Sequence, residues 1–191
     1  MDTYKTIEYR GYEIQIGVDE FAEDPRSWDN LGTMAFFHKR YNLGDKDHGL
    51  SIEQAQEIEE SNNYICLPVY MYDHSGITIN TTGFSCPWDS GKLGIIFISK
   101  KRARKEYGDK YDENKIREYL KVEVKTYDQY LRGDVYFFSI EDGDTHVDSC
   151  HGFFGDEFEE NGLLEYARNG IDVYIHQQEK TDKFENSCCA Y

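Results

Sequence analysis

Pairs of β-strand segments separated by very short turns constrain this chain more than any other feature of its sequence. Residues 134–141 and 145–154 are rich in β-branched and aromatic residues and flank a turn that contains Gly143. Residues 64–72 and 77–82 repeat this arrangement. Because a connection of a few residues can join only antiparallel neighbours, both pairs are predicted to be β-hairpins. The sequence therefore favours an antiparallel sheet.

Other segments add further strands. Residues 4–17 alternate β-forming and polar residues around Gly11, which predicts another hairpin. Residues 33–38 and 171–176 are short apolar segments, and residues 93–99 form the continuous apolar run that is typical of a buried central strand.

Amphipathic segments predict the helices. Residues 113–131 place their apolar side chains on one side of a 3.6-residue wheel, which predicts one long helix that covers the sheet. Shorter helices are predicted after Ser51, a favourable N-cap, over residues 100–107, and over residues 163–169, where Gly170 is predicted to end the helix.

Chain length limits the number of domains. If the 191 residues were divided, each part would have a marginal core, and 39% hydrophobic residues suffice for one. We therefore expect a single α+β domain over residues 1–180 and a flexible C-terminal tail over residues 181–191. The strands within residues 64–99 and 134–154 are expected to form one mainly antiparallel sheet.

The charge of the chain restricts its partners. Its 21 basic and 37 acidic residues give a net charge of −16. This balance disfavours direct nucleic-acid binding, because phosphate contacts need lysine and arginine. It favours attraction to a basic surface, including the surfaces of proteins that themselves bind nucleic acid.

Cysteine usage and hydropathy indicate a cytoplasmic protein. Five cysteines, an odd number, argue against a disulfide framework, and Cys66 is expected to be a buried free thiol. The sequence has no Cys-x-x-Cys pair, so neither a structural zinc site nor another cofactor is predicted. The N-terminus lacks the layout of a signal peptide, and no apolar run approaches the roughly 20 residues of a membrane helix. No membrane contact is expected.

Loops that combine glycine with aspartate, histidine, serine, cysteine or tryptophan suggest one possible active site. Cys150 would be the nucleophile and His74 its base, with Asp73, Asp89 or Asp148 orienting the base. His151 is a less suitable base, because neighbours in a strand point to opposite faces. A metal version would use His74, Asp73 and His151, although their spacing is not diagnostic. In the alternative interpretation, these loops are structural turns.

Two charged clusters are candidate binding surfaces. The acidic cluster combines carboxylates with an aromatic anchor, a mixture that suits a protein interface; it consists of Asp156, Glu157, Phe158, Glu159 and Glu160. The basic cluster lies on a predicted helix and consists of Lys100, Lys101, Arg102, Arg104 and Lys105. It would bind a phosphate or an acidic partner, with Ser99 as N-cap, or its cations would pair with acidic neighbours in the same chain.

Six segments within residues 25–155 carry a resemblance: DNLGTM (29–34), HKRYNLGD (38–45), DHSG (73–76), CPWDSG (86–91), YLRG (130–133) and DSC (148–150). They resemble segments of a family of small acidic accessory proteins of phages and conjugative elements. The resemblance implies a mobile-element context, and no catalytic residue is carried over from it. By analogy, small acidic proteins of such elements inhibit host-defence or nucleic-acid enzymes by imitating the charge of DNA.

These observations lead to two hypotheses. The first is a non-enzymatic acidic binding protein, similar in role to an anti-CRISPR or antirestriction protein, which engages and inhibits a basic host protein in the host cytoplasm. Its target would be a defence nuclease or another nucleic-acid-binding enzyme. The second is a small cysteine- or metal-dependent hydrolase that uses Cys150, His74 and nearby carboxylates. If the loop residues converge in one pocket, the second hypothesis gains support.

Overall fold

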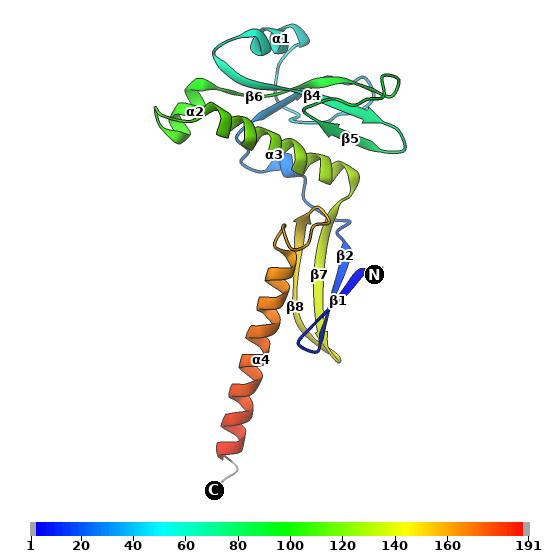
Figure 1. Cartoon of the computed structure of the whole chain (residues 1–191), viewed down its shortest axis with the longest axis vertical. Coiled ribbons are helices and arrows are strands. Elements are labelled where there is room, and N and C mark those ends of the chain that lie inside the picture. The colour runs from blue at the N-terminus through cyan, green and yellow to red at the C-terminus, as the bar shows by residue number, and fades with distance from the viewer. Residues whose placement is uncertain (1–2, 189–191) are drawn as a thin grey trace. The chain divides into compact units, whose positions relative to one another are not determined.

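The computed structural model describes the backbone of residues 3–188 and the side chains as far as Thr181. Over this range the chain forms four α-helices, one short 3-10 helix and two antiparallel four-stranded sheets (Figure 1). The predicted α+β class and the antiparallel pairing are confirmed.

The chain divides into two compact units. Unit 1 combines Met1–Ala22 with Gly133–Tyr191, and unit 2 is Glu23–Arg132. The prediction of one sheet is wrong, because the strands of residues 64–99 and those of residues 134–154 belong to different sheets. The local hairpins are correct; the error lies in which hairpins join, because long-range pairing leaves no pattern within a segment. The expectation that the chain behaves as a single domain stays a prediction.

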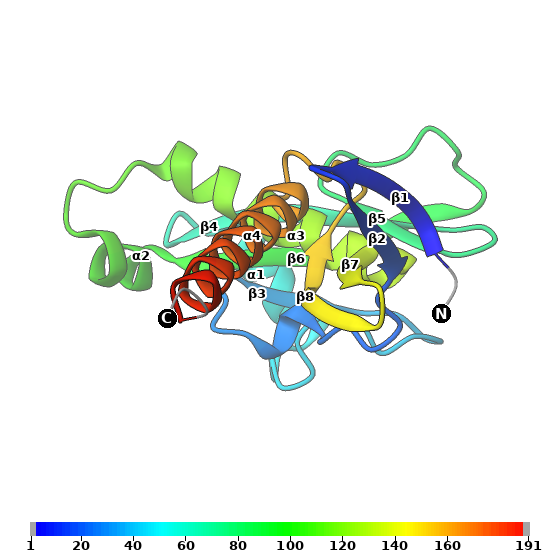
Figure 2. The same cartoon turned by 90° about the horizontal axis from the view of Figure 1, so that it is seen from below.

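Unit 1 is a sheet with one helix against it. The strand order is β1 (Thr3–Tyr9), β2 (Tyr12–Val18), β7 (Val135–Asp142) and β8 (Thr145–Phe154). The β1–β2 hairpin turns at Arg10 and Gly11, which both have positive φ, as a tight two-residue turn requires. Helix α4 (Leu163–Cys188) runs alongside β7 and β8 (Figures 1 and 2).

Helix α4 corrects the prediction for the C-terminal segment. The expected helix over residues 163–169 does not end at Gly170, and residues 171–176 are helical instead of forming a strand. Leu163, Leu164, Ala167 and Ile171 face the sheet with the spacing of a helix and are buried. The helix also takes in residues 181–188 of the predicted flexible tail, and residues 189–191 lie outside the described residues.

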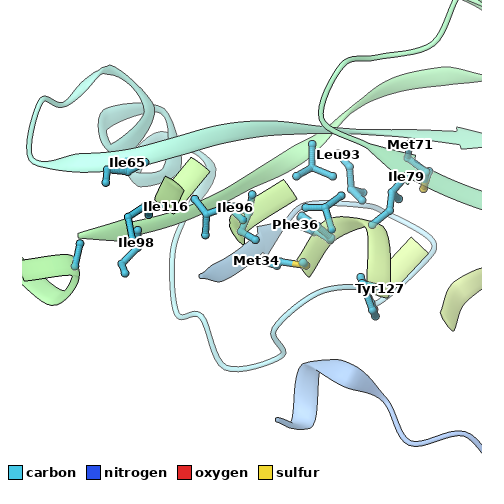
Figure 3. Close-up of a cluster of buried hydrophobic side chains, with 14 residues drawn as sticks. Met34, Phe36, Ile65, Met71, Ile79, Leu93, Ile96, Ile98, Ile116 and Tyr127 are labelled. Carbon is cyan, nitrogen blue, oxygen red and sulfur yellow. The ribbon is translucent and has the colours of Figure 1, made fainter. Parts of the chain in front are cut away.

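Unit 2 is a sheet with helices on both faces. The strand order is β3 (Thr33–Phe36), β6 (Ser90–Ser99), β4 (Tyr64–Asp73) and β5 (Ile77–Asn80). Helix α3 (Glu113–Arg132), the predicted long helix, packs Ile116, Leu120 and Tyr127 into the main core on one face (Figure 3). Helix α1 (Ile52–Glu60) packs Ala55 and Ile58 against Ala35 and Ile95 on the other face. Helix α2 (Lys100–Tyr107) follows β6 directly.

A buried arginine fixes the segment that enters unit 2. Arg26 lies in the 3-10 helix η1 (Pro25–Ser27), and its side chain is 5% exposed. Its guanidinium contacts Asp45 at 2.7 Å and Glu123 at 3.0 Å. Glu123 also accepts the backbone N–H groups of Leu31 and Gly32 at 2.8 and 3.1 Å. The segment at residues 28–32 is therefore a structural turn anchored on α3.

Candidate functional site

The predicted nucleophile and its predicted base belong to different units. Cys150 lies on β8 of unit 1, where its half-buried side chain packs against the core, and His74 lies in unit 2. His151 stacks on Phe137 at 4.8 Å and contacts Asp19 at 3.5 Å. Neither unit by itself holds the proposed cysteine–histidine pair. The geometry within the units therefore lends no support to a hydrolase built on Cys150.

Three of the predicted site residues, Asp73, His74 and Asp89, do converge within unit 2, together with Cys86. The Asp73 N–H donates to the Asp89 carbonyl oxygen at 2.9 Å, so the end of β4 lies beside the loop that precedes β6. The Asp89 Oδ2 atom is 3.5 Å from His74 Nδ1 and 3.8 Å from Cys86 Sγ. Asp89 is therefore the shared partner of the thiol and the imidazole.

This arrangement lacks the central contact of a cysteine active site. A thiol nucleophile is activated by an imidazole within hydrogen-bond reach. Here the group in contact with Cys86 is the Asp89 carboxylate, and the imidazole of His74 contacts that same carboxylate. Among the described residues, the cluster therefore shows no direct contact between the thiol and the imidazole.

A cavity of about 350 Å³ opens beside this cluster. Its lining includes Asp73, Trp88, Asp89, Gly91 and Lys92. The indole of Trp88 is 91% exposed. A large aromatic side chain that is left in solvent next to two carboxylates is unusual for a structural turn, because its burial would stabilise the fold.

Sequence analysis missed a second polar constellation, on the sheet of unit 1. His146 Nε2 is 3.4 Å from Ser149 Oγ, and His146 Nδ1 is 3.1 Å from Glu141 Oε1. The register of the β7–β8 hairpin places Glu141 opposite His146. The predicted hairpin could therefore have indicated this pair. The three side chains are exposed, and the Ser149 N–H already donates to Asp148 Oδ1 at 2.8 Å. That amide is therefore not free to stabilise an oxyanion.

The acidic cluster near residue 158 is partly buried. Phe158 is 5% exposed and packs against Tyr4 and Tyr136, so the prediction that it is a surface anchor is wrong. Its aromatic ring completes the core of unit 1 instead. Glu159 accepts two hydrogen bonds from Arg168, at 2.6 and 2.8 Å, and these bonds lower the pKa of the Glu159 carboxyl. All four carboxylates of the cluster are exposed: Asp156, Glu157, Glu160 and the Arg168-paired Glu159.

The two units differ sharply in charge. Unit 1 has 19 acidic and 5 basic residues in its sequence, a net charge of −14. Unit 2 has 18 acidic and 16 basic residues, a net charge of −2. The acidity of the chain is therefore a property of unit 1.

Carboxylates also stand opposite one another on the unit 1 sheet. Glu8 on β1 pairs in register with Glu13 on β2. Ile14 faces Ile140, and this register places Glu141 of β7 beside Glu13. Like charges on directly opposed strand positions are destabilising. The sheet face therefore carries a row of acidic side chains, of which Glu141 also contacts His146.

The basic cluster on α2 is mostly paired within unit 2. Ser99 is the N-cap, as predicted, and its hydroxyl accepts the Arg102 N–H at 3.1 Å. The pairs Lys100–Glu113 and Arg104–Asp109 have distances of 2.6 and 3.4 Å, and Arg102 donates to the Asn30 carbonyl oxygen at 2.9 Å. Lys101 and Lys105 are exposed. These contacts favour the interpretation in which the cations pair with groups of the same chain.

Among the side chains that the structure describes, no group of three or more histidine, cysteine or acidic residues is arranged to hold a metal ion. None of the helices in the described part is both long enough and apolar enough to span a membrane. No family model matches the chain, and no curated protein or solved structure matches it.

Proposed function

We propose that this chain is a non-enzymatic binding protein whose acidic unit 1 engages a basic surface of another protein. The observation that carries the proposal is the concentration of charge: unit 1 has a net charge of −14 and unit 2 one of −2. A field of one sign steers a partner of the opposite sign and raises its association rate.

The partner class follows from the same chemistry. Nucleic-acid-binding enzymes have basic surfaces that contact phosphates. A row of carboxylates across strands, such as Glu8, Glu13 and Glu141, offers such a surface a substitute for the phosphates. The cost of opposing like charges would then be offset in the complex.

The resemblance to accessory proteins of phages and conjugative elements supplies the biological part of the proposal. In that setting, the target is a host-defence nuclease or another nucleic-acid-binding enzyme, and the outcome is inhibition in the host cytoplasm. Occupation of the basic surface would exclude nucleic acid by competition.

Two charge-reversal variants of unit 1 and one matched control test the proposal. The first converts Asp156, Glu157 and Glu160 to lysine, and the second converts Glu8, Glu13 and Glu141 to lysine. The control converts Glu57, Glu60 and Glu106, which are exposed acidic residues of unit 2, to lysine. All three variants change the net charge by the same amount.

The assay measures protection of DNA from purified restriction endonucleases and RNA-guided nucleases, with association rates from surface plasmon resonance. At least one unit 1 variant should associate about tenfold more slowly with the target, and high salt should weaken the binding of the native chain. The control should stay within about twofold. Equal losses in all three variants would show that net charge alone matters and would overturn the proposal for unit 1, as would full protection by both unit 1 variants.

A further inference from the structure

The cavity beside Asp73 and Asp89 in unit 2 has the composition of a recognition site. Three features meet there: two carboxylates, an exposed indole and a strand position without a side chain. The hydrogen bond from the Asp73 N–H to the Asp89 carbonyl oxygen places the two residues side by side, at the end of β4 and directly before β6.

Groups of the same chain satisfy the hydrogen-bonding capacity of the two carboxylates only in part. The Tyr41 hydroxyl donates to Asp73 Oδ2 at 3.0 Å, and His74 and Cys86 contact Asp89 Oδ2. All of these contacts are made to Oδ2. Within the described part of the chain, the Oδ1 atoms of Asp73 and Asp89 have no hydrogen-bond partner. The cavity therefore retains acceptors for an additional donor.

The basic groups around the cavity neutralise it only in part, since Arg40 pairs with Asp73 and His74 with Asp89 through one carboxylate oxygen each. The ammonium group of Lys92 is in an ion pair with Glu59. His38 Nδ1 accepts the backbone N–H groups of Arg40 and Tyr41 at 3.3 and 3.2 Å, so this nitrogen is engaged within its own turn. The charge of the lining therefore favours the binding of a cation.

A contact within the chain indicates which kind of cation this cavity favours. Arg40 Nη1 is 3.6 Å from Asp73 Oδ2, and the guanidinium carbon lies over the Tyr41 ring at 5.1 Å from its centre. The Arg40 side chain is 72% exposed, so it sits at the edge of the site and does not fill it. A planar guanidinium combines a carboxylate contact with an aromatic face more readily than the compact ammonium of lysine does.

We propose that this cavity binds an arginine side chain of a partner protein, with the guanidinium between Asp73 and Asp89 and against the indole of Trp88. The site is made of unit 2 residues only. This site therefore goes beyond the proposed role of unit 1 and does not depend on it. It also explains why Trp88 lies in solvent in the free chain, since an exposed aromatic anchor beside a pocket is typical of an interface hot spot.

A short peptide and its neutral analogue test the proposal. The probe is acetyl-Gly-Arg-Gly-amide, and the control is the same peptide with citrulline, which keeps the shape of arginine and lacks its charge. In a Trp28→Phe background the emission comes from Trp88, because the chain has two tryptophans. We expect a saturable change in Trp88 emission with the arginine peptide, at an affinity at least about tenfold higher than that of the citrulline peptide.

Two substitutions locate the binding within the cavity. A Cβ atom added at Gly91 meets no atom within 4 Å, and Gly91 lines the cavity, so Gly91→Val fills the space without a clash. Valine also suits a strand. Gly91→Val and Asp89→Asn should each weaken arginine-peptide binding at least about fivefold, while circular dichroism and thermal unfolding confirm that both variants fold.

A variant of the other unit separates this site from general charge attraction. Asp156→Lys/Glu157→Lys/Glu160→Lys reverses three charges of unit 1 and should leave arginine-peptide binding within about twofold. The proposal is overturned if the citrulline peptide binds equally well, if folded Gly91→Val binds as the native chain does, or if the unit 1 variant weakens binding as much as Asp89→Asn does. Absence of any saturable signal overturns it as well.

Discussion

At the scale of single residues, the guanidinium of Arg26 is a buried charge held between two carboxylates. Burial acts to lower its pKa, and the hydrogen bonds and charges of Asp45 and Glu123 more than offset this effect, so its pKa is raised. If such a buried charge is removed, its partners are left as uncompensated buried charges. Arg26 therefore stabilises the turn at residues 28–32 through Glu123, which accepts two backbone N–H groups there.

We expect Arg26→Met to lower the free energy of unfolding by about 3 kcal/mol, because two partly buried carboxylates lose their partner. The matched control is Arg104→Met: the Arg104–Asp109 pair is exposed, and its loss should cost less than about 0.5 kcal/mol. Urea unfolding monitored by circular dichroism measures both. If the two substitutions have equal effects, the network around Arg26 is not what fixes this segment.

Cys66, which was predicted to be a buried free thiol, is a half-buried free thiol in the structure, and it provides a second test at the residue scale. Burial, with a smaller contribution from Glu59, raises the pKa of the Cys66 thiol to about 12. The thiolate is the reactive form, so at pH 8 only roughly one Cys66 in ten thousand is reactive. In the native chain, iodoacetamide should therefore modify Cys66 much more slowly than Cys86, and urea should abolish the difference. Mass spectrometry of the modified peptides measures both rates; equal native rates would contradict the assigned burial.

At the scale of elements, local patterns predicted the fold where an element is determined by its own residues. The hairpins at residues 64–82 and 134–154 and helix α3 follow from alternation, turn residues and helical spacing. Helix α4 was missed because Gly170 resembles a helix end and the β-branched residues after it resemble a strand. The distribution of strands between two sheets was missed because it depends on contacts between distant segments.

The candidate site was predictable to a similar extent. Glycine-containing loops with aspartate and histidine pointed to Asp73, His74 and Asp89, and these residues do meet. Their association with Cys150 was not confirmed, since an individual loop does not reveal which unit it joins. The burial of Phe158 was also hidden, because its acidic neighbours suggested an exposed segment.

Gly170 of helix α4 lies close to Asp148 of strand β8, and its substitution tests whether this contact restricts the helix. A Cβ atom there would lie 2.3 Å from Asp148 Oδ2 and 3.1 Å from Asp148 Cγ. Gly→Ala within a helix normally stabilises by up to about 1 kcal/mol, but here Gly170→Ala should destabilise by about 1 kcal/mol. In an Asp148→Ala background the same substitution should become stabilising. Chemical unfolding of the four proteins of this cycle gives the coupling energy, and an equal gain in both backgrounds would show that Asp148 does not restrict the helix.

At the scale of the whole molecule, charge and core are distributed differently. Each unit has its own buried cluster, whereas nearly all of the net charge belongs to unit 1. Repulsion among like charges destabilises a compact state, and salt screens it. The acidity of unit 1 is therefore a cost to folding, which makes sense if a basic partner removes it on binding.

This distribution predicts how salt affects each unit. Residues 23–132 contain the main core, the Arg26 network and a nearly balanced set of charges, so the fragment should fold alone. Calorimetry should show that its unfolding midpoint changes by less than about 2 °C between low salt and about 0.3 M NaCl. In the full chain, the transition that involves unit 1 should rise by several degrees, because screening reduces repulsion among 19 acidic residues opposed by 5 basic ones. The charge-reversed Glu8→Lys/Glu13→Lys/Glu141→Lys variant is the control, since opposite charges then face the remaining acids and the salt effect should shrink. An unfolded fragment would support the single-domain expectation, and a fragment as salt-sensitive as the full chain would remove unit 1 as the source of the effect.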